Sequence, residues 1–367
     1  MIAYGVDEVL ENRKHLIKGV PIILITHYYI KDSNKESVAE LFYQDPEINL
    51  SKIVCPKFGF FLDSNTTEDF EGIPVEFFNI EDFKKSLKNI RTVVFDLQDT
   101  GVKNSPILIM LFDIMKILND VDVNFLVLDR PNPLNSISYA GIIGPLDEKR
   151  LPLRHGMTIG ELASYFKSQF FISTRLNVIK MINYDREETI YDIEAGDNPY
   201  LPGIRNRDSL CLYSFLHLFT SMNISVGLGS DVEFLVFGAP WIDPDIVFDQ
   251  IIMMGFDGFS METCSFTPRV GIYSSTECHG IRFRINDLSM FDPIELFLNI
   301  TEILYSSFGE IEFLMDEDGI YLIDSFFSDE RIRITIERYI PATNAYYKAM
   351  STMESFIPAR QEVLLYS

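Results

Sequence analysis

Short apolar runs alternate with helix-like stretches through the first two-thirds of this 367-residue chain. Three of the runs, IILIT from Ile22, TVVFDL from Thr92 and NFLVLD from Asn124, are nearly continuous, as expected for strands that helices cover on both faces. We expect strands at 21–26, 52–56, 92–97, 124–129 and 177–182, and helices at 37–43, 80–88, 107–118 and 159–166. This alternation predicts an α/β fold with a Rossmann-like, doubly wound and mostly parallel sheet.

The pattern changes near residue 243, where GAPWIDPD places two prolines and two aspartates in succession. A further pair of strands is expected before this point, near 224–227 and 234–237. After it we expect a helix at 246–254, strands near 264–267 and 280–285, a long amphipathic helix at 293–308 and two C-terminal helices. The sequence therefore predicts a Rossmann-like domain at 1–243 that carries the cleft loops, and a smaller α/β domain at 244–367 that closes the cleft.

Charge and apolar patterning exclude several classes of partner. The net charge is −23 and the pI about 4.6, so no overall field attracts nucleic acid or an anionic membrane. The longest apolar run, from Ile107, is interrupted by Asp113 and Lys116 and is too short to span a bilayer. The chain shows no basic-then-apolar leader, and its four cysteines are scattered. We expect a cytoplasmic protein, although a secreted protein whose signal had been removed would look similar.

The ligand of an open α/β sheet lies beyond the carboxyl ends of the strands. The residues that follow the expected strands should therefore converge on one cleft, which is the default site. We predict that this cleft binds substrate through His27, Lys57, Gln98, Arg130, Asn132 and Arg154.

Two motifs at this edge carry most of the chemistry. In FDLQDTG, Asp96 and Gln98 point away from the face of Leu97. The motif supplies either a substrate-orienting or acid/base pair, or carboxylates, Asp96 and Asp99, that cap and brace the loop. In LDRPNPL, Arg130 offers a rigid fork of donors on a loop pinned by two prolines. The fork binds either a ligand or a carboxylate of the first motif, Asp96 or Asp99.

A third motif, LRHGMTIGEL, places Arg154 and His155 just before an expected helix whose N-terminus carries Thr158 and Glu161 in capping-box spacing. Free amides at a helix N-terminus suit an anion or a sugar hydroxyl. The alternative is that His155 is a structural, hydrogen-bonded residue.

Other mechanisms find no support in the sequence. The five histidines show no metal-ligand spacing, and there is no nucleophile elbow, Walker loop or dinucleotide fingerprint. We therefore expect no metal and no cofactor. The sequence makes no prediction about the oligomeric state.

The order of the motifs resembles one family, the exo-β-N-acetylmuramidases, which are glycosidases acting on peptidoglycan fragments from the non-reducing end. The resemblance runs almost end to end, through GVDEVLE, FDLQDTG, VLDRPNPL, LRHGMTIGELA, FGAPWID, SFTP, CHGI and the terminal LLY. It implies a Rossmann-like N-terminal domain, a smaller C-terminal domain and an active site in the cleft between them. It also adds Asn223, in the NIS stretch, to the substrate-binding residues, and a sugar or muropeptide as the ligand.

The departures from the family pattern fall on its acidic residues. The family has Pro-Glu-His-Gly-Phe after the second strand, with the glutamate implied as the catalytic acid, where this chain has Pro56-Lys57-Phe58-Gly59-Phe60. In the later glutamate-rich stretch, Thr220 and Val226 stand in place of both glutamates and Leu228 in place of an arginine.

Glycoside hydrolysis generally needs two carboxyl groups across the scissile bond, and an unperturbed lysine cannot act as the acid. We therefore interpret the chain as a divergent, non-catalytic member, a pseudoenzyme that binds a muropeptide, another amino sugar or a protein partner. One alternative is an enzyme of altered chemistry that uses Asp99, His155 and Asp231. Another is a working muramidase whose carboxylates are Asp63, Asp231 or Glu233.

Overall fold

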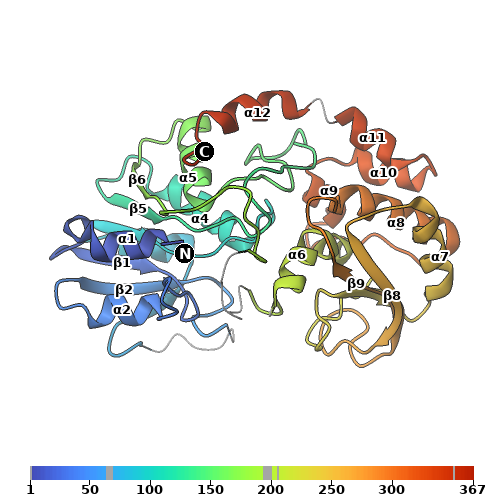
Figure 1. Cartoon of the computed structure of the whole chain (residues 1–367), viewed down its shortest axis with the longest axis horizontal. Helices are drawn as coiled ribbons and strands as arrows, with labels where there is room; N and C mark the ends of the chain where they lie inside the picture. The colour runs from blue at the N-terminus through green and yellow to red at the C-terminus, as the bar shows by residue number, and fades with distance from the viewer. Residues whose placement is uncertain (1, 63–68, 193–200, 205, 350–351) are drawn as a thin grey trace. The chain divides into compact units, whose positions relative to one another are not determined.

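The computed structural model describes residues 2–62, 69–192, 201–204, 206–349 and 352–367 (Figure 1). The chain forms two compact units. The first unit comprises residues 1–137, 156–202 and 357–367, and the second comprises 138–155 and 203–356. Both units are therefore assembled from segments that are far apart in the sequence.

The first unit is built on a six-stranded sheet in the order β3-β2-β1-β4-β5-β6, and every neighbouring pair is parallel. This is the strand order of a Rossmann fold, so the predicted fold class is confirmed. The strands are β1 (Pro21–Ile25), β2 (Asn49–Cys55), β3 (Val75–Phe77), β4 (Thr92–Phe95), β5 (Asn124–Leu128) and β6 (Arg175–Ile179).

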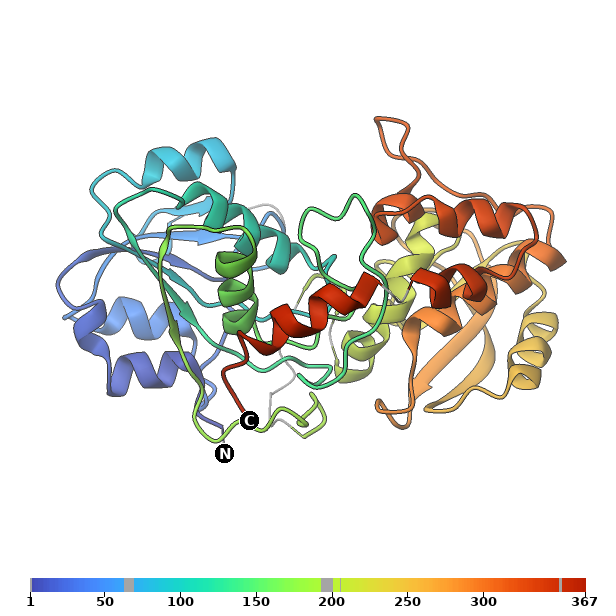
Figure 2. The same cartoon turned by 90° about the horizontal axis from the view of Figure 1, so that it is seen from above.

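Helices cover both faces of this sheet. Three of them pack side by side on one face, namely α3 (Ile80–Ser86), α4 (Pro106–Ile117) and α5 (Ile159–Gln169). On the other face lie α1 (Gly5–Glu11) and α2 (Val38–Gln44), as Figure 2 shows. Because helices cover both faces, the central strands are almost wholly buried, which explains their continuous apolar runs.

The predicted capping box begins α5. Thr158 Oγ1 accepts a hydrogen bond from the Glu161 amide at 3.2 Å, and the Thr158 amide donates to Glu161 Oε2 at 3.0 Å. Glu161 is fully buried and also forms an ion pair with Arg186.

The second unit contains a three-stranded antiparallel sheet in the order β7-β9-β8. Its strands are β7 (Val236–Ala239), β8 (Phe259–Phe266) and β9 (Cys278–Ile285). Its helices are α6 (Arg207–Leu216), α7 (Pro244–Met254), α8 (Pro293–Ser307), α9 (Leu322–Phe327), α10 (Arg331–Glu337) and α11 (Ala342–Ala349). A last helix, α12 (Met353–Gln361), spans the point where the chain re-enters the first unit. Short 3₁₀ turns lie at Lys14–Leu16 and His217–Ser221.

The units divide the chain at a different place from the predicted boundary. The sequence places it at 243–244, whereas the units divide at 202–203 and the last eleven residues, 357–367, return to the first unit. The reason is that β7, an apolar run like those before it, pairs with β9 and not with the parallel sheet. The strand expected at 224–227 also did not form; Ser225 makes one isolated bridge to Gly238.

No helix in the described part of the chain is long and apolar enough to cross a membrane. Within the same ranges, no three His, Cys, Asp or Glu side chains gather closely enough to hold a metal ion.

Candidate functional site

The strand order of the parallel sheet reverses between β1 and β4, and this switch point is where open α/β sheets bind ligands. Since all six strands run the same way, the loops at His27, Lys57, Asp99 and Arg130 leave one edge of the sheet. The prediction that these loops share an edge is confirmed. Which of their side chains can contact a ligand depends on the hydrogen bonds and ion pairs that each one makes within the protein.

Arg130 is held by Asp96 in a buried ion pair. Its Nε and one terminal nitrogen donate to the two carboxylate oxygens of Asp96, the second bond measuring 3.0 Å. The guanidinium also lies over the ring of Tyr4, 5.1 Å from its centroid. Burial, the largest single effect, lowers the pKa of Arg130, but the charge and hydrogen bonds of Asp96, together with smaller effects of Tyr4 and Asp7, raise that pKa above its ordinary value. Of the two partners that the sequence left open, Asp96 holds the fork, so Arg130 braces the β4 and β5 loops.

The amides of Gln98 and Asn132 are also used as braces. Gln98 Nε2 donates to the carbonyls of Asp99 at 3.0 Å and Pro131 at 2.8 Å, which ties the β4 loop to the β5 loop. Asn132 donates to the carbonyl of Met157 and accepts from the Leu134 amide. The amide nitrogen of Gln98 and both polar atoms of the Asn132 side chain therefore bond within the protein, although the sequence predicts these residues as ligand contacts.

The loop after β4 is rich in buried polar atoms. Asp99 is 3% exposed, and its Oδ2 accepts from the Gly101 amide at 2.8 Å. The hydroxyls of Thr100 and Ser105 are fully buried and have no hydrogen-bond partner within the described ranges. Lys103 is buried as well.

Asp129 faces into the protein, where four donors surround it. It accepts from the Gly160 amide at 2.7 Å, the Thr158 hydroxyl at 2.8 Å, the Tyr366 hydroxyl at 2.6 Å and the Arg130 amide at 3.0 Å. Burial raises the pKa of Asp129 to about 7, against the effect of its donors. The carboxylate joins the C-terminal tail to the start of α5 and is fully buried.

His27 is buried at the carboxyl end of β1 and is 1% exposed. Burial, with a smaller effect from the charge of Arg130, lowers the pKa of His27 to about 3, so the imidazole is neutral at physiological pH. Its Nδ1 has no hydrogen-bond partner in the described part of the chain. The rings of Phe58 and Tyr29 lie 6.1 and 6.5 Å from the imidazole. At the carboxyl ends of β1 and β2, aromatic rings therefore lie beside one neutral polar group, the imidazole of His27.

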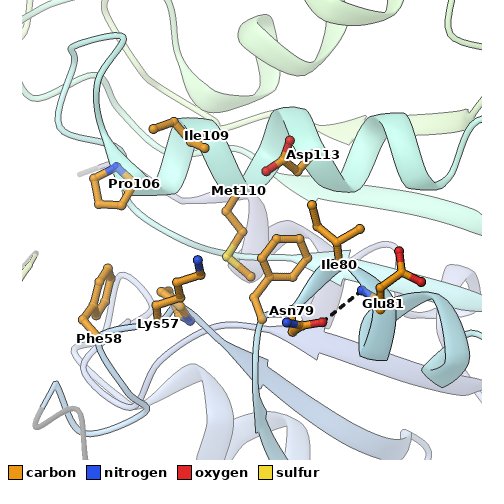
Figure 3. A pocket seen from close by; sticks show the side chains of 11 residues that line it. Lys57, Phe58, Asn79, Ile80, Glu81, Pro106, Ile109, Met110 and Asp113 are labelled. Carbon is orange, nitrogen blue, oxygen red and sulfur yellow. Dashed lines mark hydrogen bonds between the residues drawn. The ribbon is translucent and has the colours of Figure 1, made fainter. Parts of the chain in front are cut away.

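A pocket of about 490 Å³ opens beside Lys57 (Figure 3). It lies between the end of β2, the start of α3 and the first turns of α4. The residues that line it are Pro56, Lys57, Phe58, Phe78, Asn79, Ile80, Glu81, Pro106, Ile109, Met110 and Asp113. Lys57 is exposed, and in Figure 3 its ammonium is directed into this space.

The remaining predicted residues belong to the second unit. Arg154 and His155 are buried, and burial lowers the pKa of Arg154 to about 10. Asn223 uses its side chain to bind the 310–312 segment, donating to the Glu310 carbonyl at 2.7 Å and accepting from the Glu312 amide at 2.9 Å. Asp231 is 87% exposed and lies 3.9 Å from Arg269. Asn223 is therefore a brace, and Asp231 is a surface residue.

Thr220 and Val226 stand where the family pattern has its two later glutamates, and neither residue has a carboxylate. Thr220 donates to the His217 carbonyl at 2.6 Å, and Val226 is buried. Glu233 accepts from the Gly229 amide at 3.0 Å. Asp63, the other carboxylate considered from the sequence, lies outside the described residues.

Comparison with known proteins matches both parts of the chain to one family. Residues 22–202 match the N-terminal model, and residues 211–366 the C-terminal model, of "exo-beta-N-acetylmuramidase NamZ". The chain is 28% identical to the peptidoglycan beta-N-acetylmuramidase NamZ of Bacillus subtilis strain 168, across 99% of this chain and 91% of that protein.

Two crystal structures of DUF1343 family proteins from Bacteroides fragilis NCTC 9343 share the fold. One has a TM-score of 0.89 at 20% identity, and the other has a TM-score of 0.73 at 22% identity. Each alignment covers 100% of this chain and 99% of the other. Because the two family models together span almost the whole chain, this protein belongs to the NamZ family of exo-β-N-acetylmuramidases.

Proposed function

We propose that this chain binds a muramic-acid-containing sugar or muropeptide, without the standard hydrolytic chemistry of its family. The observation that carries the proposal is Lys57, an exposed lysine at the carboxyl end of β2, where the family pattern has a glutamate. A protonated lysine is a poor proton donor to a glycosidic oxygen, and its charge opposes a developing oxocarbenium ion.

The carboxylates on the neighbouring loops do not replace that glutamate. Asp96 is fully buried and paired with Arg130. Asp129 has a pKa in the range that suits a general acid, but it is fully buried and surrounded by donors. A carboxyl group must come within hydrogen-bonding reach of the leaving oxygen to act as an acid, and neither residue presents an oxygen to solvent.

Sugar binding is supported by the aromatic side chains at the same edge. Tyr29 and Phe58 flank His27 and are each partly exposed. Ligand sites commonly combine aromatic walls with a few polar groups that fix orientation, and here the neutral imidazole of His27 is such a group. The name of the Bacillus subtilis relative, a peptidoglycan beta-N-acetylmuramidase, favours muramic acid as the sugar.

Calorimetry with a muramic-acid-containing disaccharide, together with release from a chromogenic β-muramide, tests this function. We expect the wild type to bind the disaccharide and to release no chromophore above a buffer blank. Tyr29→Ala should weaken binding about fivefold, the value of one aromatic contact. Phe171→Ala is the matched control, because Phe171 is a 91% exposed aromatic residue at the far end of α5. A wild type that neither binds nor cleaves would contradict the proposal.

An enzyme of altered chemistry is the second candidate, and Asp99 is the observation that favours it. Asp99 follows β4 beside the switch point, among the buried hydroxyls of Thr100 and Ser105. His155 and Asp231 belong to the second unit, where one is buried and the other almost fully exposed. If the wild type releases the chromophore and Asp99→Asn abolishes the release, this candidate replaces the first.

A further inference from the structure

The pocket beside Lys57 lies at the carboxyl end of β2 in the first unit. Its walls come from the carboxyl end of β2, the turn between β3 and α3, and the first two turns of α4 (Figure 3). Its volume of about 490 Å³ falls within the range of small-molecule sites. None of its lining residues belongs to the second unit, so the pocket is complete within the first.

The walls of this pocket are mainly apolar. Phe58 and Phe78 contribute two rings, and Ile80, Ile109 and Met110 line it from α3 and α4. Ile80 and Ile109, which both line the pocket, are 42% and 41% exposed. An apolar body placed here would remove both from water, and such burial is the main source of affinity in sites of this kind.

Of the three charged residues that line the pocket, Lys57 is the one without an ion-pair partner in the described part of the chain. Its ammonium is directed toward the space between Phe58, Pro106 and Met110 in Figure 3. Over the described ranges Lys57 makes no ion pair and no side-chain hydrogen bond; the ion pairs of the neighbouring β2, β3, α3 and α4 join other residues.

The two carboxylates that line the pocket are already partnered on their own helices. Glu81 pairs with Lys84 at 2.8 Å, and Asp113 pairs with Lys116 at 3.5 Å. The first amides of α3 are also occupied, because Asn79 Oδ1 accepts from Glu81 and Asp82. These partners leave Lys57 as the group that an incoming ligand can satisfy.

The N-terminus of α4 adds to the preference for a negative group. Pro106 is the first residue of this twelve-residue helix and lines the pocket, and Ser105 at the N-cap makes no side-chain capping bond. The positive end of a helix dipole favours an anion nearby. It acts here in the same direction as Lys57.

We propose that this pocket binds a monocarboxylate with an apolar body, the carboxylate on Lys57 and the body between the phenylalanines and α4. A monoanion fits better than a dianion, because Glu81 and Asp113 face the same space and would repel a second negative charge. The assignment goes beyond sugar binding and does not depend on it.

Titration calorimetry of the full chain with 4-phenylbutyrate tests the assignment, with 4-phenylbutanol as the uncharged probe. We expect the acid to bind about tenfold more tightly than the alcohol, the factor of one charge-assisted hydrogen bond. Lys57→Met, at an exposed position where the fold is retained, should remove this difference and leave the affinity for the alcohol unchanged. Lys57→Arg should restore it.

Two further variants complete the design. Ile109→Trp fills the pocket from α4 and should abolish binding of both probes. Lys18→Met removes an exposed lysine that pairs with Glu47 and should leave both affinities unchanged. Equal affinity of the acid for the wild type and Lys57→Met, or no binding to the wild type, overturns the proposal. The muramic-acid disaccharide is titrated separately with Tyr29→Ala, so either result can fail while the other stands.

Discussion

The hydroxyl of Tyr366 donates a hydrogen bond of 2.6 Å to the carboxylate of Asp129, although 237 positions separate the two residues in the sequence. Beside it, the Leu365 amide donates to Glu161 at 2.8 Å, and Arg360 donates to the carbonyls of Gly156 and Ser136. The C-terminal segment 357–367 therefore holds the start of α5. It also holds the two places where the chain leaves the first unit, after residue 137, and re-enters it, at residue 156.

Tyr366→Phe should lower the free energy of unfolding by about 1–2 kcal/mol, because it removes one donor from a buried carboxylate. The loss should be larger at pH 8 than at pH 5, since the pKa of Asp129 is about 7 and a bond to a charged acceptor is the stronger one. Urea unfolding at both pH values measures the difference. Tyr43→Phe, at a 41% exposed position in α2, is the control and should change stability by less than about 0.5 kcal/mol. Equal losses at the two pH values would contradict the role given to Asp129.

His27 should make the fold less stable in acid. The pKa of His27 is about 3 in the folded protein, against an ordinary value of 6.5. Between pH 6.5 and 3 the imidazole is therefore protonated in the unfolded chain and neutral in the folded chain. The free energy of unfolding falls as the pH drops through this range. The limit of this effect is about 4–5 kcal/mol for a shift of this size.

His27→Gln cannot take up that proton, so its unfolding free energy should depend less on pH. We expect the stability advantage of the wild type over His27→Gln to shrink as the pH is lowered from 7.5 to 4.5. Urea unfolding midpoints at half-unit pH intervals provide the measurement. A constant gap between the two proteins would mean that the imidazole is not buried in its neutral form.

Arg130→Ala should cost about 3–5 kcal/mol, because it leaves Asp96 buried without its partner. The matched control is Arg175→Ala, whose ion pair with Asp122 is exposed on both sides and should contribute at most about 1 kcal/mol. Thermal or urea unfolding of both variants measures the contrast. An unchanged melting temperature in Arg130→Ala would show that the pair does not brace the β4 and β5 loops.

The sequence predicts the parallel sheet well, because continuous apolar runs identify strands that are buried on both faces. It misses β3, since the three residues Val75–Phe77 are too few to form a pattern. The predicted domain boundary differs from the observed one for another reason. The run at β7 resembles the earlier strands, and only its antiparallel pairing with β9 assigns it to the second sheet.

The candidate site was harder to predict than the fold. Motif positions correctly indicate the edge of the sheet where Gln98, Arg130 and Asn132 gather. Whether each polar group meets a ligand or a neighbouring loop depends on contacts between segments, and the structure gives all three internal partners. Tyr366 carries no local signal at all, because its role exists only through Asp129.

Lys57 stands where the family pattern has its acidic residue. The wild type and Lys57→Ala should both release no more chromophore from a β-muramide than a buffer blank. Lys57→Glu combined with Phe58→His supplies the carboxyl and imidazole of the family pattern, and a positioned general acid contributes about 10²–10⁴ in rate. We therefore expect measurable release from this double variant, and more when Val226→Glu adds a second carboxylate. Val226 is buried, so the melting temperature of the triple variant must be checked first. A wild type that turns over, and is not slowed by Lys57→Ala, would show that another residue is the acid.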